Sequence, residues 1–172
     1  MDNLDFLTRV TIWAALVTYA GAEVYRSGLV GNADDRRSRT FWTLGCFLYV
    51  THVVSAFHNS YDWSHTIAAA ETLRQTEVII GTSWNGGIFI NYLFTIFWCG
   101  ETAWWWLKPT DYINRPVWVQ RTTWTVFFVM ILNGAVIFVA GPMRWFGASI
   151  TVILVWTWWV YSHRLSRNRL VR

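Results

Sequence analysis

The chain has 172 residues, of which 54% are hydrophobic and only 14% are charged. A soluble domain carries about 25% charged residues, and residues 122–143 and 145–162 here contain no Asp, Glu, Lys or Arg. Such stretches are too extensive to hide inside one small soluble core. The composition therefore excludes an ordinary soluble domain and predicts an all-α membrane protein, because lipid is the solvent that accepts these segments.

The first predicted transmembrane segment covers about residues 4–25, and the second covers about 41–57. Both are continuous apolar runs rather than alternating patterns, which is typical of helices, and about 20 residues suffice to cross hydrocarbon. Ala20-Gly21-Ala22 resembles a signal-peptidase site, but Asp2 and Asp5 stand where a signal peptide carries basic residues. We therefore expect the first segment to be retained.

The loop after the second segment contains a predicted amphipathic helix over about residues 64–80. Ser64 is a suitable N-cap and Gly81 a suitable C-terminal stop. Apolar residues recur at helical spacing between them, at Ile67, Ala70, Leu73 and Ile80. We expect this helix to lie on the outer membrane interface, with residues 82–87 turning the chain back toward the bilayer.

Three further predicted spans follow, at about residues 86–107, 122–140 and 145–161. The whole chain, residues 1–172, is predicted to form one domain. The fold class is thus a bundle of about five transmembrane helices with one short amphipathic helix in the outer-face loop.

The basic residues predict the orientation of this bundle. Eleven of them fall in or beside the loops on one side: Arg26, Arg36, Arg37, Arg39, Lys108, Arg115, Arg121, Arg164, Arg167, Arg169 and Arg172. The other side has only Arg9, Arg74 and Arg144. The positive-inside rule then places the N-terminus outside the cell membrane, here an inner membrane, and the C-terminus in the cytoplasm. Termini on opposite sides require an odd number of spans, which agrees with the five segments. The basic residues are topology signals in this context, and no nucleic-acid partner is expected.

Three histidines lie at or beside the outer loop and suggest a binding site. Imidazole is the commonest metal ligand, so the predicted metal ligands are His52, His58, His65, Asp62, Glu71 and Glu77. The predicted cofactor-binding residues are His52, His58, Tyr61, His65, Asn91 and Asn133. The competing interpretation is a structural hydrogen-bond network between helices. His52 and His58 are six residues apart, so they point about 120° from each other on an ideal helix.

Two acidic residues fall within the apolar segments near the inner side. We expect Glu23 to pair with Arg26 three residues later, and Glu101 to be either paired or part of a proton route. The tryptophans, 14 in all, are expected to be interfacial anchors without further function. Cys46 and Cys99 are expected to be two buried thiols that do not form a disulfide.

The sequence contains no dinucleotide-binding, P-loop or hydrolase motif, and its activity is undetermined at this stage. Three functions compete: a membrane protein that binds a metal ion, haem or quinone through the outer histidines and carboxylates, a non-catalytic structural or accessory subunit, and a small transporter or channel. The first is preferred and the last ranks lowest. The lipid bilayer is the expected partner, with other copies of the chain or other membrane subunits.

Overall fold

The computed structural model describes residues 3–81, 84 and 86–170, and every regular element within these residues is helical. Helix α1 (Asn3–Ser27) and helix α2 (Asp35–Ser60) form an antiparallel hairpin. The Asp34 carboxylate caps α2 by accepting a hydrogen bond of 2.9 Å from the backbone N–H of Arg37. The hairpin turn uses Gly28 and Gly31, both with positive φ.

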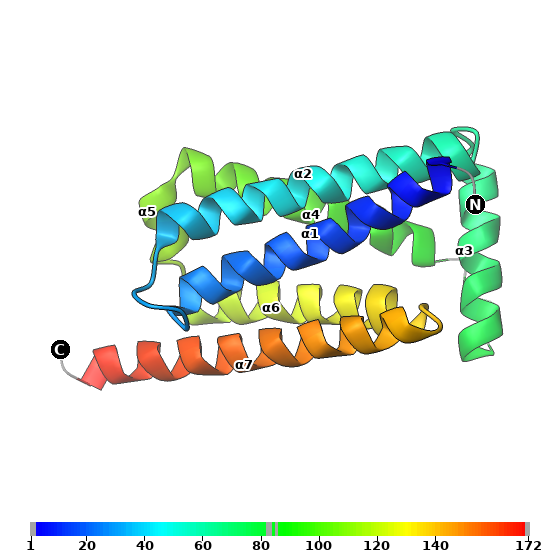
Figure 1. The fold of residues 1–172 in the computed structure, drawn as a ribbon. Coiled ribbons are helices and arrows are strands. Elements are labelled where there is room, and N and C mark those ends of the chain that lie inside the picture. Colours follow the sequence, from blue (N-terminus) through cyan, green and yellow to red (C-terminus); the bar gives the residue numbers. More distant parts are fainter. Residues whose placement is uncertain (1–2, 82–83, 85, 171–172) are drawn as a thin grey trace.

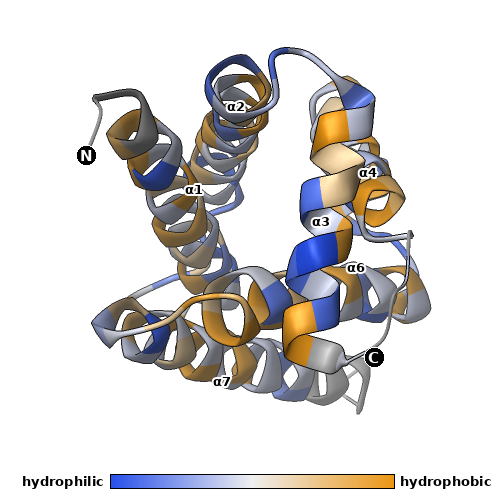
Figure 2. Cartoon of the chain, turned by 90° about the vertical axis from the view of Figure 1, so that its right-hand side faces the viewer, coloured by the Kyte–Doolittle hydropathy of each residue, from blue (hydrophilic) through white to orange (hydrophobic). Residues whose placement is uncertain are grey.

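Helix α3 (His65–Ile80) is the predicted amphipathic helix, and its two ends are confirmed. The Ser64 hydroxyl accepts a hydrogen bond from the backbone N–H of Ile67. Gly81 ends the helix in the left-handed conformation, with φ of 73°. Figures 1 and 2 show α3 lying across one end of the molecule, roughly perpendicular to the long helices. The turn predicted over residues 82–87 lies partly outside the described residues.

The second half of the chain is less regular than predicted. Helix α4 (Gly87–Leu107) is followed by an unpredicted five-residue helix, α5 (Pro109–Ile113). The predicted fourth span is divided into α6 (Val117–Ile131) and a π-helical segment, η1 (Leu132–Ile137). Helix α7 (Pro142–Leu170) then runs back along α6 and α1.

The long helices lie side by side, and their connections alternate between the two ends of the bundle (Figure 1). One end carries the α1–α2 turn, α5 and the end of α7, and the opposite end carries α3 and the η1–α7 turn. The arginine-rich connections therefore gather at one end, which we call the inner end. The end that carries α3 is the outer end.

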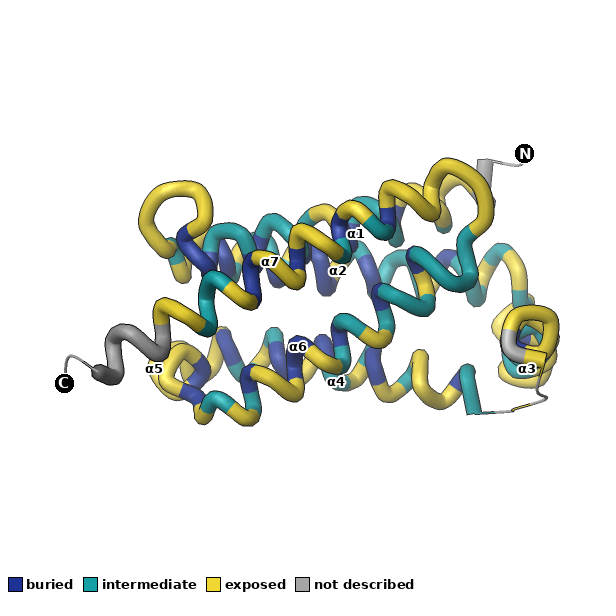
Figure 3. The backbone as a smooth tube through the Cα atoms, turned by 90° about the horizontal axis from the view of Figure 1, so that it is seen from below, coloured by how far each residue is buried: buried dark blue, intermediate teal, exposed yellow. Residues whose placement is uncertain are grey.

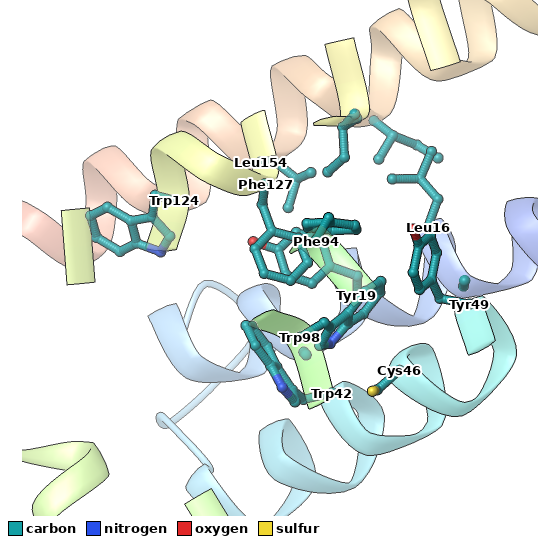
Figure 4. Close-up of a cluster of buried hydrophobic side chains, with 14 of the residues drawn as sticks. Leu16, Tyr19, Trp42, Cys46, Tyr49, Phe94, Trp98, Trp124, Phe127 and Leu154 are labelled. Atoms are coloured by element: carbon teal, nitrogen blue, oxygen red, sulfur yellow. The ribbon is translucent and has the colours of Figure 1, made fainter. Parts of the chain in front are cut away.

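Aromatic side chains fill the space between the helices (Figure 4). The ring of Tyr19 stacks on that of Phe127, with centroids 4.1 Å apart. Trp42 is completely buried and packs against the rings of Trp98 and Trp105, as well as those of Tyr19 and Phe127. Several helices are thus joined through large aromatic rings.

Among the described residues, two helices are long and apolar enough to cross a membrane by length and composition: α2 and the Pro142–Arg164 part of α7. The predicted count of five spans is therefore matched by only two helices on this measure. The other segments have identifiable interruptions. Helix α6 ends after 15 residues where η1 begins, α4 contains Glu101 and four Trp, and α1 contains Arg9, Glu23 and Arg26.

Many residues on the surface of the long helices are exposed (Figure 3), and large apolar side chains are among them. Phe47 on α2 is 67% exposed, Ile96 on α4 is 69% exposed, and Val152 on α7 is 68% exposed. Soluble monomers rarely expose contiguous apolar patches of this kind. Two carboxylates within these helices, Glu23 and Glu101, are by contrast buried.

Helix α7 passes η1 at a contact that only glycine allows. A Cβ atom on Gly147 would collide with the backbone carbonyl oxygen of Ala135. We expect Gly147→Ala to lower the free energy of unfolding by about 1–3 kcal/mol, the usual cost of overpacking, measured by thermal unfolding in detergent. The matched control is Gly134→Ala, where a Cβ would meet nothing within 4 Å. Equal stability of the two variants would contradict this contact.

Candidate functional site

The outer histidines are held by three separate contacts. The Nδ1 atom of His52 lies 2.7 Å from the backbone oxygen of Thr8 on α1. That of His58 accepts a hydrogen bond of 3.4 Å from the indole N–H of Trp63, and that of His65 lies 2.9 Å from the hydroxyl of Tyr92 on α4. These contacts tie α2 to α1 and α3 to α4, which is the pattern of the competing structural interpretation.

The predicted metal ligands do not form a cluster. No group of three or more His, Cys, Asp or Glu side chains suited to a metal ion occurs in the part of the chain that the structure describes. The Glu71 carboxylate is instead bound by Arg74 at 2.7 and 2.9 Å and by Gln75 at 2.9 Å. Asp62 and Glu77 are exposed. A metal site at this end therefore has no support from the geometry.

The remaining predicted cofactor residues are dispersed. Asn91 is exposed rather than turned toward the bundle interior, and Asn133 is half-buried within η1. The ring of Tyr61 packs against that of Phe57, with centroids 5.6 Å apart. Aromatic rings at this end contact one another in tilted or edge-on arrangements, and Phe57 also contacts Trp63 and Tyr92.

The Glu71–Arg74 contact on α3 makes a specific titration prediction. Hydrogen bonds from Arg74, and then from Gln75, lower the pKa of the Glu71 carboxyl to about 2. Because the pKa of Glu71 is lower in the folded state than in the unfolded state, the contact stabilises α3 fully at pH values above about 4.5. This stabilisation is lost as the pH falls from about 4.5 toward 2. We expect carboxyl NMR of Glu71 to show this low midpoint. In Arg74→Gln the midpoint should rise, and an unchanged value would contradict the contact.

The inner half of the bundle contains an assembled polar site. Its best-defined part is the ion pair between Glu101 on α4 and Arg115, whose charged atoms are 2.7 Å apart and buried. The same carboxylate oxygen accepts hydrogen bonds from the Tyr112 hydroxyl at 3.0 Å and from the Thr123 hydroxyl at 3.4 Å. Elements α4, α5 and α6 thus converge on one carboxylate.

Arg115 is positioned by the short connection between α5 and α6. Its Nε and one terminal nitrogen both donate to the side-chain oxygen of Gln120, at 2.9 and 2.7 Å. Its guanidinium group also lies 3.9 Å from the centroid of the Tyr112 ring. The guanidinium is therefore fixed by two hydrogen bonds to one amide oxygen, by an ion pair and by an aromatic face.

Glu23 on α1 forms the second part of the site. One carboxylate oxygen accepts hydrogen bonds from the indole N–H groups of Trp124 at 3.1 Å and Trp158 at 3.0 Å. The other oxygen lies 3.7 Å from Arg26, which confirms the expected pairing of these two residues. Helices α6 and α7 are thereby bound to α1 through one carboxylate.

Arg26 connects the two parts through aromatic rings. Its guanidinium carbon lies 5.3 Å from the Trp105 ring and 5.5 Å from the rings of Tyr112 and Tyr161. Tyr112 also contacts Arg115, so one ring lies between the two guanidinium groups. We call the set Glu23, Arg26, Glu101, Tyr112, Arg115, Gln120, Trp124 and Trp158 the inner polar centre.

The charges of the inner polar centre sum to zero, since two carboxylates oppose two guanidinium groups. An unpaired charge in a nonpolar interior is very costly, so this balance lets four charged groups remain buried. Within the centre, three buried atoms have no hydrogen-bond partner: the Gln120 amide nitrogen, the Glu23 Oε1 and one Arg26 nitrogen. The last two face each other at 3.7 Å.

Sequence reasoning identified Glu23 and Glu101 but missed most of their partners. The sequence predicts Arg115 only as a topology signal. Trp105 and Trp158, predicted as interfacial anchors, are buried within the bundle, and so is Trp124. The available signal was the need of each intramembrane carboxylate for a partner. That need does not say which of the many basic and aromatic residues supplies it.

Comparison with known proteins adds nothing to these observations, since no protein-family model, no curated protein and no solved structure matches the chain.

The buried ion pair gives a stability prediction. Arg115→Gln leaves the Glu101 carboxylate without its opposite charge, and we expect the free energy of unfolding in detergent to fall by about 3–5 kcal/mol. Combining it with Glu101→Gln removes the uncompensated charge, so the double variant should regain part of that loss.

The matched control is Arg74→Gln, which breaks the exposed ion pair with Glu71 on α3 and should leave thermal unfolding nearly unchanged, because exposed pairs contribute little. If Arg115→Gln changed thermal unfolding no more than this control does, neutralisation of the Glu101 carboxylate by Arg115 would not stabilise the fold.

Proposed function

We propose that the chain is an integral membrane protein that crosses the bilayer five times, as a non-catalytic helical subunit. The observation that carries the membrane placement is the distribution of side chains, with large apolar groups exposed along α2, α4 and α7 and two Glu–Arg pairs buried between the helices. This distribution suits a lipid solvent, which accepts apolar side chains and drives charged ones inward.

The arrangement of the connections supports the proposed orientation. The arginine-rich loops share the inner end and the amphipathic helix α3 lies across the outer end (Figure 1). Ile67 is 47% exposed and Val78 is 74% exposed on α3, which fits a helix lying in the membrane interface. The inner end therefore faces the cytoplasm in this proposal, and the N-terminus lies outside.

The role as a structural subunit follows from how the inner polar centre is built. Its carboxylates and guanidinium groups are bound mainly to one another and to indole and phenol groups from α1, α4, α5, α6 and α7. Such closed pairing joins helices. The exposed apolar faces contact lipid, further copies of the chain or other membrane proteins. This proposal reverses the ranking suggested by the sequence, in which a cofactor site at the outer histidines came first.

The membrane path is tested with reporters fused to each end. We expect a reporter on the N-terminus to be found on the outer side of the cell membrane and a reporter on the C-terminus to be found in the cytoplasm, because five crossings separate the two ends. The unfused protein should stay with membranes after alkaline carbonate washing. Reporters in the same compartment, or release by carbonate, would contradict the five-span path.

The subunit role is tested by the mass of the purified particle. In a mild detergent we expect light scattering to give a protein mass of at least two chains, or a reproducible second protein, against 20.1 kDa for one chain. A harsher detergent that separates subunits serves as the control. A homogeneous folded monomer in the mild detergent would argue against a subunit.

A further inference from the structure

The two cysteines of the chain meet between helices that are far apart in sequence. Cys46 on α2 and Cys99 on α4 are 53 residues apart, yet their Sγ atoms are 3.8 Å apart. They are the only cysteines in the sequence, and neither is in a disulfide. Sequence reasoning expected two separate buried thiols, but the structure brings them together and exposes Cys99.

The pair lies well inside the bundle rather than at its ends. Cys46 is 11 residues from the start of α2 and Cys99 is 8 residues from the end of α4. At 1.5 Å per residue these positions are about 17 and 12 Å from the inner end. Figure 4 shows Cys46 at the edge of the aromatic cluster formed by Trp42 and Trp98.

The two thiols differ in exposure, and one of them is accessible from outside the bundle. Cys46 is buried, whereas Cys99 is exposed on the surface of the bundle. A disulfide has an Sγ–Sγ distance of about 2.05 Å, so the atoms must approach by roughly 1.8 Å from their present 3.8 Å. Side-chain rotation and small shifts between packed helices cover such distances.

We propose that Cys46 and Cys99 form a redox-active dithiol that a quinone dissolved in the bilayer oxidises to a disulfide. This inference rests on the proposed membrane placement, since Cys99 then faces acyl chains and water-soluble oxidants do not reach it. Two S–H bonds break and one S–S bond forms. The two electrons and two protons released pass to the quinone oxygens, which become those of a hydroquinone. The product disulfide links α2 covalently to α4.

The experiment uses the full chain, reduced and reconstituted in phosphatidylcholine nanodiscs without oxygen, with decylubiquinone as the probe. We expect the intact mass to fall by about 2 Da, because two hydrogens are lost when the disulfide forms. Neither cysteine should then react with maleimide. One hydroquinone should appear for each protein, and dithiothreitol should restore both thiols. Cys46→Ser and Cys99→Ser should each abolish hydroquinone formation.

A position control separates the pair from thiol exposure alone. The variant Cys99→Ser/Leu93→Cys keeps two cysteines but moves the exposed one six residues, or about 9 Å, along α4. Leu93 is 66% exposed, so the new thiol is accessible and should nevertheless remain reduced. Equal quinone reduction by this variant would overturn the proposal.

Diamide, a water-soluble oxidant added to detergent-solubilised protein, completes the design. If diamide forms the disulfide and decylubiquinone in nanodiscs does not, the quinone assignment is overturned. If neither oxidises the pair, the dithiol itself is overturned. Failure of the membrane placement is recognised separately, as release of the protein by carbonate.

Discussion

A nonpolar interior does not tolerate an uncompensated charge, and the inner half of this bundle is organised around that constraint. Glu101 is neutralised by Arg115, and Glu23 is bound by two indole N–H groups beside Arg26. Satisfying these two carboxylates requires groups from five different elements. Their relative positions are therefore specified by directional bonds, whereas apolar packing alone tolerates sliding between helices.

Aromatic residues have a double role in this arrangement. The rings of Tyr112 and Trp105 pack in a stack with centroids 4.5 Å apart, and both also face the guanidinium of Arg26. Trp124 and Trp158 stack on each other while donating to the same carboxylate oxygen of Glu23. Large rings thus supply both the apolar area and the polar contacts that a small bundle needs.

Apolar runs and caps predicted most of the helices, because these signals are local. The ends of α3 follow from Ser64 and Gly81. The π-helical segment η1 has no such local signal, and it lies where Gly147 of α7 closely approaches Ala135, a contact between helices. The partners within the inner polar centre could not be predicted for the same reason. The histidines are near in sequence, whereas Glu23 meets partners 101 and 135 residues away.

These long separations have a consequence for biogenesis. Glu23 emerges from the ribosome 135 residues before Trp158, which at 5–20 residues per second is roughly 7–27 s earlier. Until Trp124 is synthesised, only Arg26, one helical turn away, is available to the carboxylate. Helix α1 therefore completes its polar contacts only after the last helix is synthesised, so a chain that stops before Trp158 leaves Glu23 without one of its two indole donors.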